Sequence, residues 1–239
     1  MRFLSLALCA VAVAQVPEPP VNYGIVLFPG FQAMDVFGPL DVLNTLSMRQ
    51  TLNLYIFANQ RGLVPTKHAM EGVKSNFGEA VMADYAFNDT EIPDLDVLIV
   101  PGGAGTRDSQ TQAEVAPFLS KIYPQLQYLV AVCTGSALVA RTGILDRRRA
   151  TTNKLAWEWA TSQGPNVDWV PRARWVRDGD IWTGSGITAS LDTIYAFVAH
   201  VYGEPTAANL SRDLEYVRWT DADNDPFGDF YNTSWPIVG

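Results

Sequence analysis

Cys133 is the side chain in this sequence best placed to act as a nucleophile. It follows an apolar run of strand length, a helix-forming run begins almost at once, and small residues stand two positions before and after it, at Ala131 and Gly135. This spacing is typical of a nucleophile elbow, a sharp strand-to-helix turn. The N–H groups at the start of a helix favour the thiolate, the reactive form of cysteine. The alternative is an unreactive core cysteine, because free cysteines are often buried.

A glycine-rich segment at 101–105 also follows a short apolar run. Glycines permit a turn whose N–H groups point into a site. We expect the amides of Gly103 and Thr134 to form an oxyanion hole beside the sulfur, and Gly102 to contribute to substrate binding. The segment has neither the GxxxxGK[ST] nor the GxGxxG pattern, so phosphate binding is disfavoured.

Alternating strands and helices must position these groups. Strands are predicted at 21–28, 52–58, 96–100 and 128–132, and helices at 35–48, 113–126, 135–141, 154–162, 190–202 and, as the last helix, 205–216. Asp178-Gly179 predicts a hairpin between strands at 174–177 and 180–183. This alternation indicates an α/β fold whose mainly parallel sheet is covered on both faces. Ligands bind beyond the carboxyl ends of such strands, so we expect the loops at 29–35, 101–106 and 133–136 to line the site.

The composition excludes several classes of protein. Of the 239 residues, 48% are hydrophobic and 18% are charged. This balance is typical of a compact globular domain and excludes a disordered, collagen-like or coiled-coil chain. The formal net charge of −8 opposes binding to nucleic acid or to an anionic membrane surface, since both attract basic proteins. We therefore expect neither a nucleic-acid nor a membrane partner.

The first 14 residues are typical of a secretory signal peptide that is cleaved after Ala14. The alternative, an N-terminal anchor helix, is disfavoured because the apolar run is shorter than the ~20 residues that span a bilayer. Residues 15–20 are interpreted as a linker, 21–218 as the globular domain and 219–239 as an acidic, aromatic tail. Cleavage would remove Cys9, and the one remaining cysteine could form no internal disulfide.

Three sequons agree with export, because they predict N-glycosylation at Asn88, Asn209 and Asn232. Occupied sites must lie on the surface. A single sequon is weak support because the pattern often occurs by chance, but the signal peptide gives all three more weight. The sequence therefore predicts a secreted, extracellular glycoprotein.

Several motifs together resemble the DJ-1/PfpI superfamily of class I glutamine amidotransferase-like proteins. They are AVCTGS at 131–136, PGG at 101–103 and ATTN at 150–153. DVFGPLDVL at 35–43 and DGDIWTGSGITASLD at 178–192 resemble the isonitrile hydratase-like branch, which also supplies the sensing domain of some AraC-type regulators. The resemblance implies a flavodoxin-like three-layer sandwich with a central, mainly parallel sheet, and a homodimer.

The resemblance also implies roles for particular side chains. In the superfamily a carboxyl from the first strand-to-helix segment approaches the sulfur, and by position that carboxyl is Asp35. Burial beside a thiolate would raise its pKa, so Asp35 would hold a proton and act as acid or base. The alternative is a helix N-cap. Thr134 is expected to hold water or developing charge. Gly186 and Ile187, in a loop beside the cysteine, are expected to bind substrate.

The chain departs from the family pattern where histidines are common. Thr134 follows the cysteine, where protease-like members have histidine, and Asn153 follows the paired threonines, where many relatives have histidine. The two histidines of the chain, His68 and His200, follow no strand at the predicted active edge. These departures disfavour a cysteine–histidine dyad and peptidase activity.

Three functions are compatible with these residues, and we favour the first. A cofactor-free, isonitrile hydratase-like enzyme would form a thioimidate on Cys133, with Asp35 as acid and base, and release an N-substituted formamide. The second is glyoxalase-like hydration of an α-oxoaldehyde, which the missing histidine weakens. The third is a non-catalytic small-molecule-binding or redox-sensing protein. The sequence lacks HExxH and clustered metal ligands, so neither a metal nor a cofactor is expected.

Overall fold

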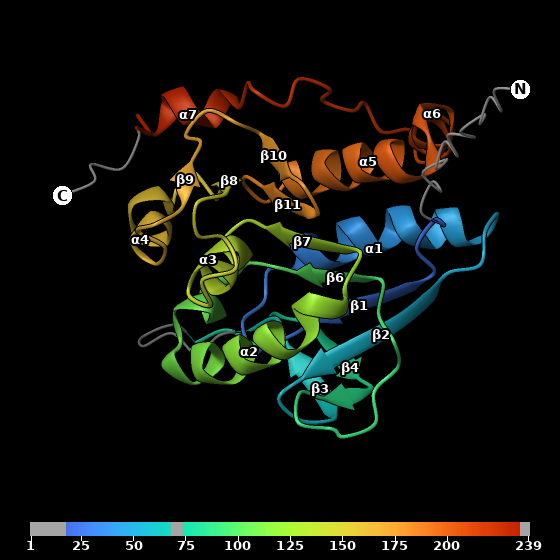
Figure 1. The fold of residues 1–239 in the computed structure, drawn as a ribbon, viewed down its shortest axis with the longest axis vertical. Helices are drawn as coiled ribbons and strands as arrows, with labels where there is room; N and C mark the ends of the chain where they lie inside the picture. The colour runs from blue at the N-terminus through green and yellow to red at the C-terminus, as the bar shows by residue number, and fades with distance from the viewer. Residues whose placement is uncertain (1–17, 68–73, 235–239) are drawn as a thin grey trace, which may run out of the picture.

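A seven-stranded sheet forms the centre of the structure (Figure 1). The computed structural model describes residues 18–67 and 74–234, so the predicted signal peptide and His68 lie outside the described residues. The strands lie side by side in the order β10 (Trp175–Asp178), β11 (Ile181–Gly184), β7 (Tyr128–Val132), β6 (Val97–Val100), β1 (Asn22–Val26), β2 (Asn53–Ala58) and β5 (Tyr85–Ala86). All neighbouring pairs are parallel except β10–β11. The predicted, mainly parallel sheet is confirmed.

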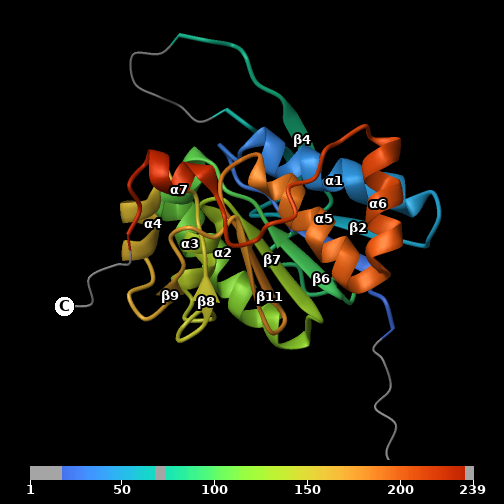
Figure 2. The same ribbon diagram turned by 90° about the horizontal axis from the view of Figure 1, so that it is seen from above.

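Helices cover both faces of this sheet, which makes three layers (Figure 2). One layer holds α1 (Ala33–Ser47), α5 (Ala189–Tyr202) and α6 (Glu204–Asp213). The other holds α2 (Ser109–Ile122) and α3 (Gly135–Ala140), with α4 (Trp157–Ser162) packed against α3. This arrangement is the flavodoxin-like sandwich expected from the sequence. Among the described residues, no helix has the length and apolar character needed to span a bilayer.

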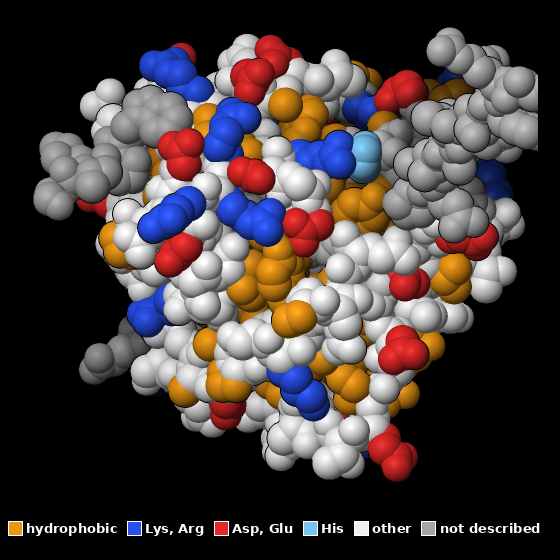
Figure 3. Space-filling view, viewed as in Figure 1, with side chains coloured by type: hydrophobic (Ala, Val, Ile, Leu, Met, Phe, Trp, Pro, Cys, Tyr) orange, Lys and Arg blue, Asp and Glu red, His pale blue; other side chains and the backbone are white. Residues whose placement is uncertain are grey.

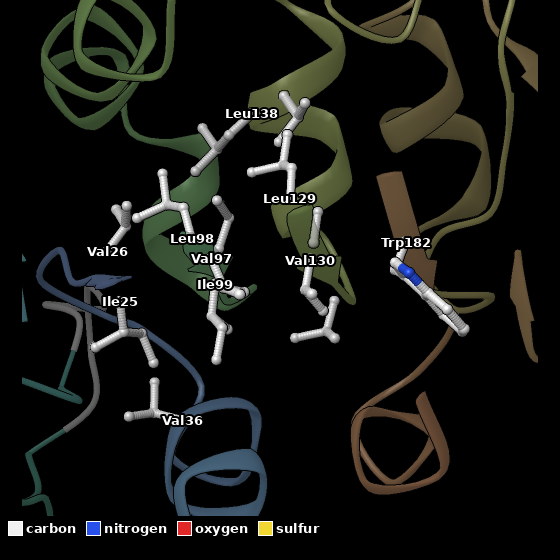
Figure 4. Close-up of a cluster of buried hydrophobic side chains, with 14 of the residues drawn as sticks. Ile25, Val26, Val36, Val97, Leu98, Ile99, Leu129, Val130, Leu138 and Trp182 are labelled. Atoms are coloured by element: carbon white, nitrogen blue, oxygen red, sulfur yellow. The ribbon is translucent and has the colours of Figure 1, made fainter. Parts of the chain in front are cut away.

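Side chains of the central strands form the core on both sides of the sheet (Figure 4). Successive residues of a strand point to opposite faces, so Ile25 and Val26 of β1 point toward different helical layers. Figure 4 shows Leu138 of α3 and Val36 of α1 on opposite sides of these strands. All four residues of β6 are buried, which explains why its sequence is continuously apolar. Each large aliphatic side chain buried in this way contributes roughly 1.5–3 kcal/mol.

Helix α4 begins at Trp157 rather than at the predicted residue 154. The Oδ1 atom of Asn153 accepts the N–H of Ala156 at 2.9 Å, and this side-chain bond forms a turn in place of the first helical turn. Lys154 is buried and bonds to the interior rather than pointing to solvent. The residues before α4 are therefore fixed by long-range contacts that hydrophobic periodicity does not reveal.

Several short strands lie outside the predicted elements. The antiparallel pair β3 (Gly62–Pro65) and β4 (Ala80–Ala83) and the parallel pair β8 (Arg149–Ala150) and β9 (Asp168–Trp169) form two small sheets. Strands of two to four residues carry too little pattern to be recognised. The predicted hairpin is present, with both strands one residue later than expected and Gly179 at φ +63 in its turn.

The expectation that the helix at 205–216 is the last one is wrong. α6 ends at Asp213, and a further helix, α7 (Pro226–Phe230), lies in the tail near α4 (Figures 1 and 2). The Asp225 carboxylate caps α7 by accepting the N–H of Phe227. An Asp N-cap followed by proline is a helix-start signal. Five residues, however, are too few to show a helical hydrophobic period.

Charges of both signs are interspersed on the face shown in Figure 3, with hydrophobic side chains between them. The basic groups of this face do not form the continuous stripe that a nucleic-acid backbone attracts. Within residues 18–67 and 74–234, no three His, Cys, Asp or Glu side chains come together in a way that could hold a metal ion.

We expect Gly135→Ala to destabilise the protein. A Cβ at this position would lie 2.3 Å from the carbonyl oxygen of Val100 and 2.6 Å from that of Pro101. Because backbone atoms cannot move aside easily, the overpacking should cost about 1–3 kcal/mol. Gly186→Ala is the control, since its Cβ would meet no atom closer than 3.7 Å. Urea denaturation measures both, and an unchanged free energy of unfolding in Gly135→Ala would contradict the tight contact.

Candidate active site

Three loops meet at the carboxyl edge of the central strands, as the sequence predicts. The first and second are joined by the N–H of Gln32, which donates to the carbonyl oxygen of Gly102 at 2.8 Å. The second and third are joined by the N–H of Gly103, which donates to the hydroxyl oxygen of Thr134 at 3.0 Å. The parallel register of β1, β6 and β7 brings these loops together, because their strands end at the same edge.

Cys133 occupies a strained elbow between β7 and α3. Its φ of +55 lies in the left-handed region, which costs a non-glycine residue of order 1–3 kcal/mol. Three hydrogen bonds hold the backbone there. Its N–H donates to Gly184 at 3.1 Å, and its carbonyl oxygen accepts the hydroxyls of Ser136 at 2.9 Å and Thr152 at 3.1 Å. The geometry is therefore that of the predicted nucleophile elbow rather than of an unstrained core position.

The Asp35 carboxyl lies in the first turn of α1 and is fully buried. Its Oδ2 atom accepts the N–H of Gly102 at 3.0 Å. The buried Oδ1 atom has no hydrogen-bond partner among the described residues. Gly102, which holds Oδ2, adjoins Cys133 so closely that a Cβ on it would lie 2.8 Å from the Cβ of Cys133. The alternative interpretation of Asp35 as a helix N-cap is wrong, because Gln32 occupies that position.

Burial raises the pKa of Asp35 to about 7, although the Gly102 N–H and the Cys133 thiol act in the opposite direction. Burial and then the Asp35 charge raise the pKa of the Cys133 thiol well above its usual value, and hydrogen bonds from Thr134 N–H and Asn153 offset only part of this effect. The predicted thiolate is therefore not favoured. The cost of removing the charged sulfur from water outweighs the stabilisation that the N-terminus of a six-residue helix gives it. Near neutral pH the pair retains at least one proton.

The predicted oxyanion hole needs correction. The Gly102 amide already donates to Asp35, and the Gly103 amide to the Thr134 hydroxyl. Thr106 also donates to that hydroxyl at 3.1 Å, so the Thr134 side chain fastens the loops together. The Thr134 N–H instead lowers the pKa of the Cys133 thiol. Of the amides predicted to serve the substrate, only that of Thr134 acts on the Cys133 sulfur.

Asn153 is a site residue whose role the sequence did not reveal. Its Nδ2 atom donates to the Cys133 sulfur at 3.3 Å, while Oδ1 accepts the Ala156 N–H and fixes the orientation of the amide. An amide N–H can stabilise negative charge on sulfur but, unlike imidazole, cannot take up its proton. The signal available in the sequence is the ATTN motif at 150–153, whose asparagine stands where many relatives have histidine.

A cavity of about 230 Å³ adjoins this amide. Gly186 and Ile187, both predicted to bind substrate, line it together with Asn153. His200 lies elsewhere, near the far end of α5, where its ring contacts Arg177. The site is thus built from a thiol, a carboxyl and an amide. His200, the histidine among the described residues, is not part of it.

Comparison with known proteins agrees with this geometry. The DJ-1/PfpI family model matches residues 24–200. The chain belongs to the DJ-1/PfpI family. It is similar to the isonitrile hydratase of Pseudomonas putida, with 34% identity over 82% of this chain and 79% of that protein. A deglycase of Thermococcus kodakarensis is 22% identical over 65% of this chain and 84% of its own.

Among solved structures, this DJ-1/PfpI protein resembles a THiJ/PfpI family protein from Pseudomonas syringae. The TM-score is 0.66 at 26% identity, and the match covers 90% of this chain and 84% of the other. The similarity therefore extends over nearly the whole described chain. The relatives include enzymes, but they do not share one activity.

We expect Asp35→Asn to change the pH dependence of stability. The pKa of this carboxyl is about 7 in the folded protein against a usual value of 3.8. The folded state therefore binds the proton more tightly, and the free energy of unfolding of the wild type falls as the pH rises between these values. The slope is at most about 1.4 kcal/mol per pH unit. An asparagine at position 35 does not titrate, so it removes this pH dependence, while its side-chain oxygen can still accept the Gly102 N–H.

Urea denaturation across this pH range measures the effect. Asp41→Asn is the matched control, because Asp41 lies on the exposed side of the same helix. The difference in unfolding free energy between Asp35→Asn and wild type should grow with pH, and that between Asp41→Asn and wild type should stay constant. Parallel curves for Asp35→Asn and wild type would refute a buried, neutral carboxyl.

Proposed function

We propose that this protein is a cofactor-free cysteine hydratase that converts an isonitrile and water into an N-substituted formamide. One observation carries the proposal: Gly102 adjoins the Cys133 elbow and holds the buried Asp35 carboxyl with its N–H. Burial raises the pKa of this carboxyl to about 7, and its charge in turn raises the pKa of the Cys133 thiol. The side chain that donates to this sulfur is the amide of Asn153. The 34% identity to an isonitrile hydratase supports the same reaction.

The first half of the reaction joins substrate to enzyme. The active pair carries one proton, on either the thiol or the carboxyl. The Cys133 sulfur attacks the terminal carbon of R–N≡C and forms a C–S bond, while Asp35 delivers the proton to the same carbon and forms a C–H bond. The product is a neutral thioimidate beside a carboxylate. No oxidant or reductant is required, and a positioned acid of this kind contributes about 10²–10⁴-fold to the rate.

The second half releases the formamide. The Asp35 carboxylate takes a proton from water as its oxygen bonds to the thioimidate carbon, and then passes that proton to the nitrogen. It next takes the remaining hydroxyl proton as the C–S bond breaks, which forms the formyl C=O and returns the pair to its starting state. Hydrogen bonds from the Thr134 N–H and Asn153 lower the pKa of the Cys133 thiol and so assist sulfur as a leaving group.

Glyoxalase-like hydration of an α-oxoaldehyde is the second candidate, and the similarity to a deglycase favours it. The conversion of an α-oxoaldehyde to a hydroxy acid must move a proton between two neighbouring carbons, and this step requires a base close to the substrate. Asn153 stands where a histidine could serve, and an amide does not accept that proton. We therefore rank this activity below the isonitrile reaction.

Protein with a free thiol should release formamide from a simple isonitrile, with kcat/KM rising through a pH of about 7 as the first proton leaves the pair. Cys133→Ala should abolish the reaction, Asp35→Asn should lower kcat by about 10²–10⁴-fold, and Asp41→Asn should leave it unchanged. The formyl proton signal in NMR measures the rate. Lactate from methylglyoxal without any formamide would favour the second candidate. Undiminished turnover by Cys133→Ala would exclude the thioimidate.

We also propose that the protein is exported. The signal peptide predicted at 1–14 lies outside the described residues, and three exposed sequon asparagines support the proposal. They are Asn88, Asn209 and Asn232. An N-linked glycan needs such exposure, because its bulk cannot enter the core. The homodimer implied by the resemblance stays a prediction.

Expression of the full chain in a eukaryotic secretory host tests export. We expect the protein in the medium, beginning at Gln15, with a mass that falls after endoglycosidase treatment. Replacing the three sequon asparagines by glutamine should remove that mass shift without preventing secretion. A chain retained inside the cell with Met1 intact would contradict the predicted cleavage after Ala14.

A further inference from the structure

We propose that the C-terminal segment, residues 219–234, supplies an aromatic wall to the substrate cavity. This wall selects isonitriles whose N-substituent is one aromatic ring or an uncharged apolar group of similar size. The inference rests on the proposed function and names its substrate class. The family match ends at residue 200, so the segment lies beyond the part of the chain that the match covers.

Asp225 anchors the C-terminal segment to the body of the protein. Its side chain is buried, accepts a hydrogen bond from the hydroxyl of Ser185 and lies 3.6 Å from the guanidinium of Arg174. Further along, the indole N–H of Trp157 donates to the carbonyl oxygen of Ser234 at 2.8 Å. The segment is thus fastened on both sides of α7, which holds that helix near α4 (Figure 1).

Helix α7 places two aromatic rings at the cavity. Phe227 and Tyr231 line it together with the aliphatic side chains of Leu155 and Ile187. Phe227 is 47% exposed and Tyr231 41% exposed, so part of each ring is left without protein contacts. Phe230, on the same helix, is 75% exposed and does not line the cavity. An apolar ligand in the cavity would cover surface that the fold leaves open.

The size of the cavity suits a small substituent. Its volume is about 230 Å³. A cavity of roughly 150 Å³ lined by apolar side chains accommodates benzene, whereas sites for drug-sized ligands start at roughly 300 Å³. One ring with a few attached atoms therefore fits, and a larger aromatic system would extend beyond the cavity.

The basic side chains that line the cavity are already engaged by protein groups. The guanidinium of Arg174 lies 2.7 Å from Asp192 and also faces Asp225. The ammonium of Lys154 donates to Thr151 at 2.6 Å and to a backbone carbonyl, and burial lowers its pKa to about 7. Among the described lining residues, these two basic side chains are thus engaged by protein groups. A substituent bearing carboxylate or phosphate would gain no unpartnered cation, which favours an uncharged group.

Asn153 adjoins both the cavity and the Cys133 sulfur. It lines the cavity, and its Nδ2 atom lies 3.3 Å from the Cys133 sulfur. The R–N≡C group is linear, so a substrate whose terminal carbon meets the sulfur holds its substituent about two bond lengths away along a straight line. The adjoining cavity is where that substituent would lie, while the small reacting end stays at the buried pair.

The test compares benzyl isonitrile with methyl isonitrile, whose substituent is too small to reach the aromatic wall. In the Phe227→Ala/Tyr231→Ala double variant, kcat/KM for benzyl isonitrile should fall about tenfold, mainly through KM, since aromatic contacts contribute ~0.5–1.5 kcal/mol each. The value for methyl isonitrile should change by less than about twofold. Phe77→Ala, which removes an exposed ring that does not line the cavity, is the matched control and should behave as wild type with both. Equal losses for the two substrates would overturn the proposal.

A binding measurement separates this inference from the proposed reaction. In the Cys133→Ala background, calorimetry measures the affinity of the cavity for N-benzylformamide and N-methylformamide without turnover. The aromatic wall predicts weaker binding of the benzyl compound when Phe227 and Tyr231 are truncated. If no isonitrile is converted by wild-type protein, the proposed function fails, and this binding difference still supports the wall. If N-benzylformamide binds Cys133→Ala equally well with and without the Phe227→Ala/Tyr231→Ala truncations, the wall is refuted even when turnover is observed.

Discussion

The site depends on keeping one carboxyl and one thiol together, away from water. Away from water, the carboxyl and the thiol each ionise less readily. A negative charge on either group makes ionisation of the other still less favourable. Burial therefore raises the pKa of Asp35 to about 7 and that of Cys133 well above its usual value. A proton held between the two can serve as acid at one step and be recovered at the next. Water in the pocket would weaken both effects, which is why a tightly packed surrounding structure matters.

That packing comes from the meeting of three strand ends. The strained backbone of Cys133 is fixed by hydrogen bonds to Gly184, Ser136 and Thr152, which come from three different segments. Gly102 adjoins the elbow so closely that a Cβ would lie 2.8 Å from the Cβ of Cys133. The same glycine uses its amide to hold the Asp35 carboxyl. Strain at Cys133, close glycine contacts and the position of the Asp35 carboxyl are thus parts of a single arrangement.

In the proposed function, the carboxyl and the thiol carry out the reaction, and the C-terminal segment determines which substrates are preferred. The pair lies within residues 24–200, which the family model matches, whereas the aromatic residues of α7 follow that range. A fold supports many activities when loops and appended segments change what reaches a constant reactive centre. Here the buried salt bridge of Arg174 with Asp192 and Asp225 gives the C-terminal segment a defined position. Two partly exposed rings can then act as a wall rather than as a mobile tail.

Local pattern was sufficient for much of this protein. Continuous apolar strands require a sheet covered on both faces, and small residues around Cys133 permit a sharp turn, so both could be predicted from neighbouring residues alone. Resemblance to a family placed Asp35 near the sulfur, which spacing by itself could not. The donation from Asn153 to sulfur, the engagement of the Gly103 amide by Thr134 and the docking of Asp225 appeared only in the tertiary structure. Each joins residues more than 15 positions apart, and the partner of a hydrogen-bonding group at that separation is decided by how whole elements pack. The same holds for the thiol: its position at a helix start favours ionisation, but the burial that prevents it is a property of the folded chain.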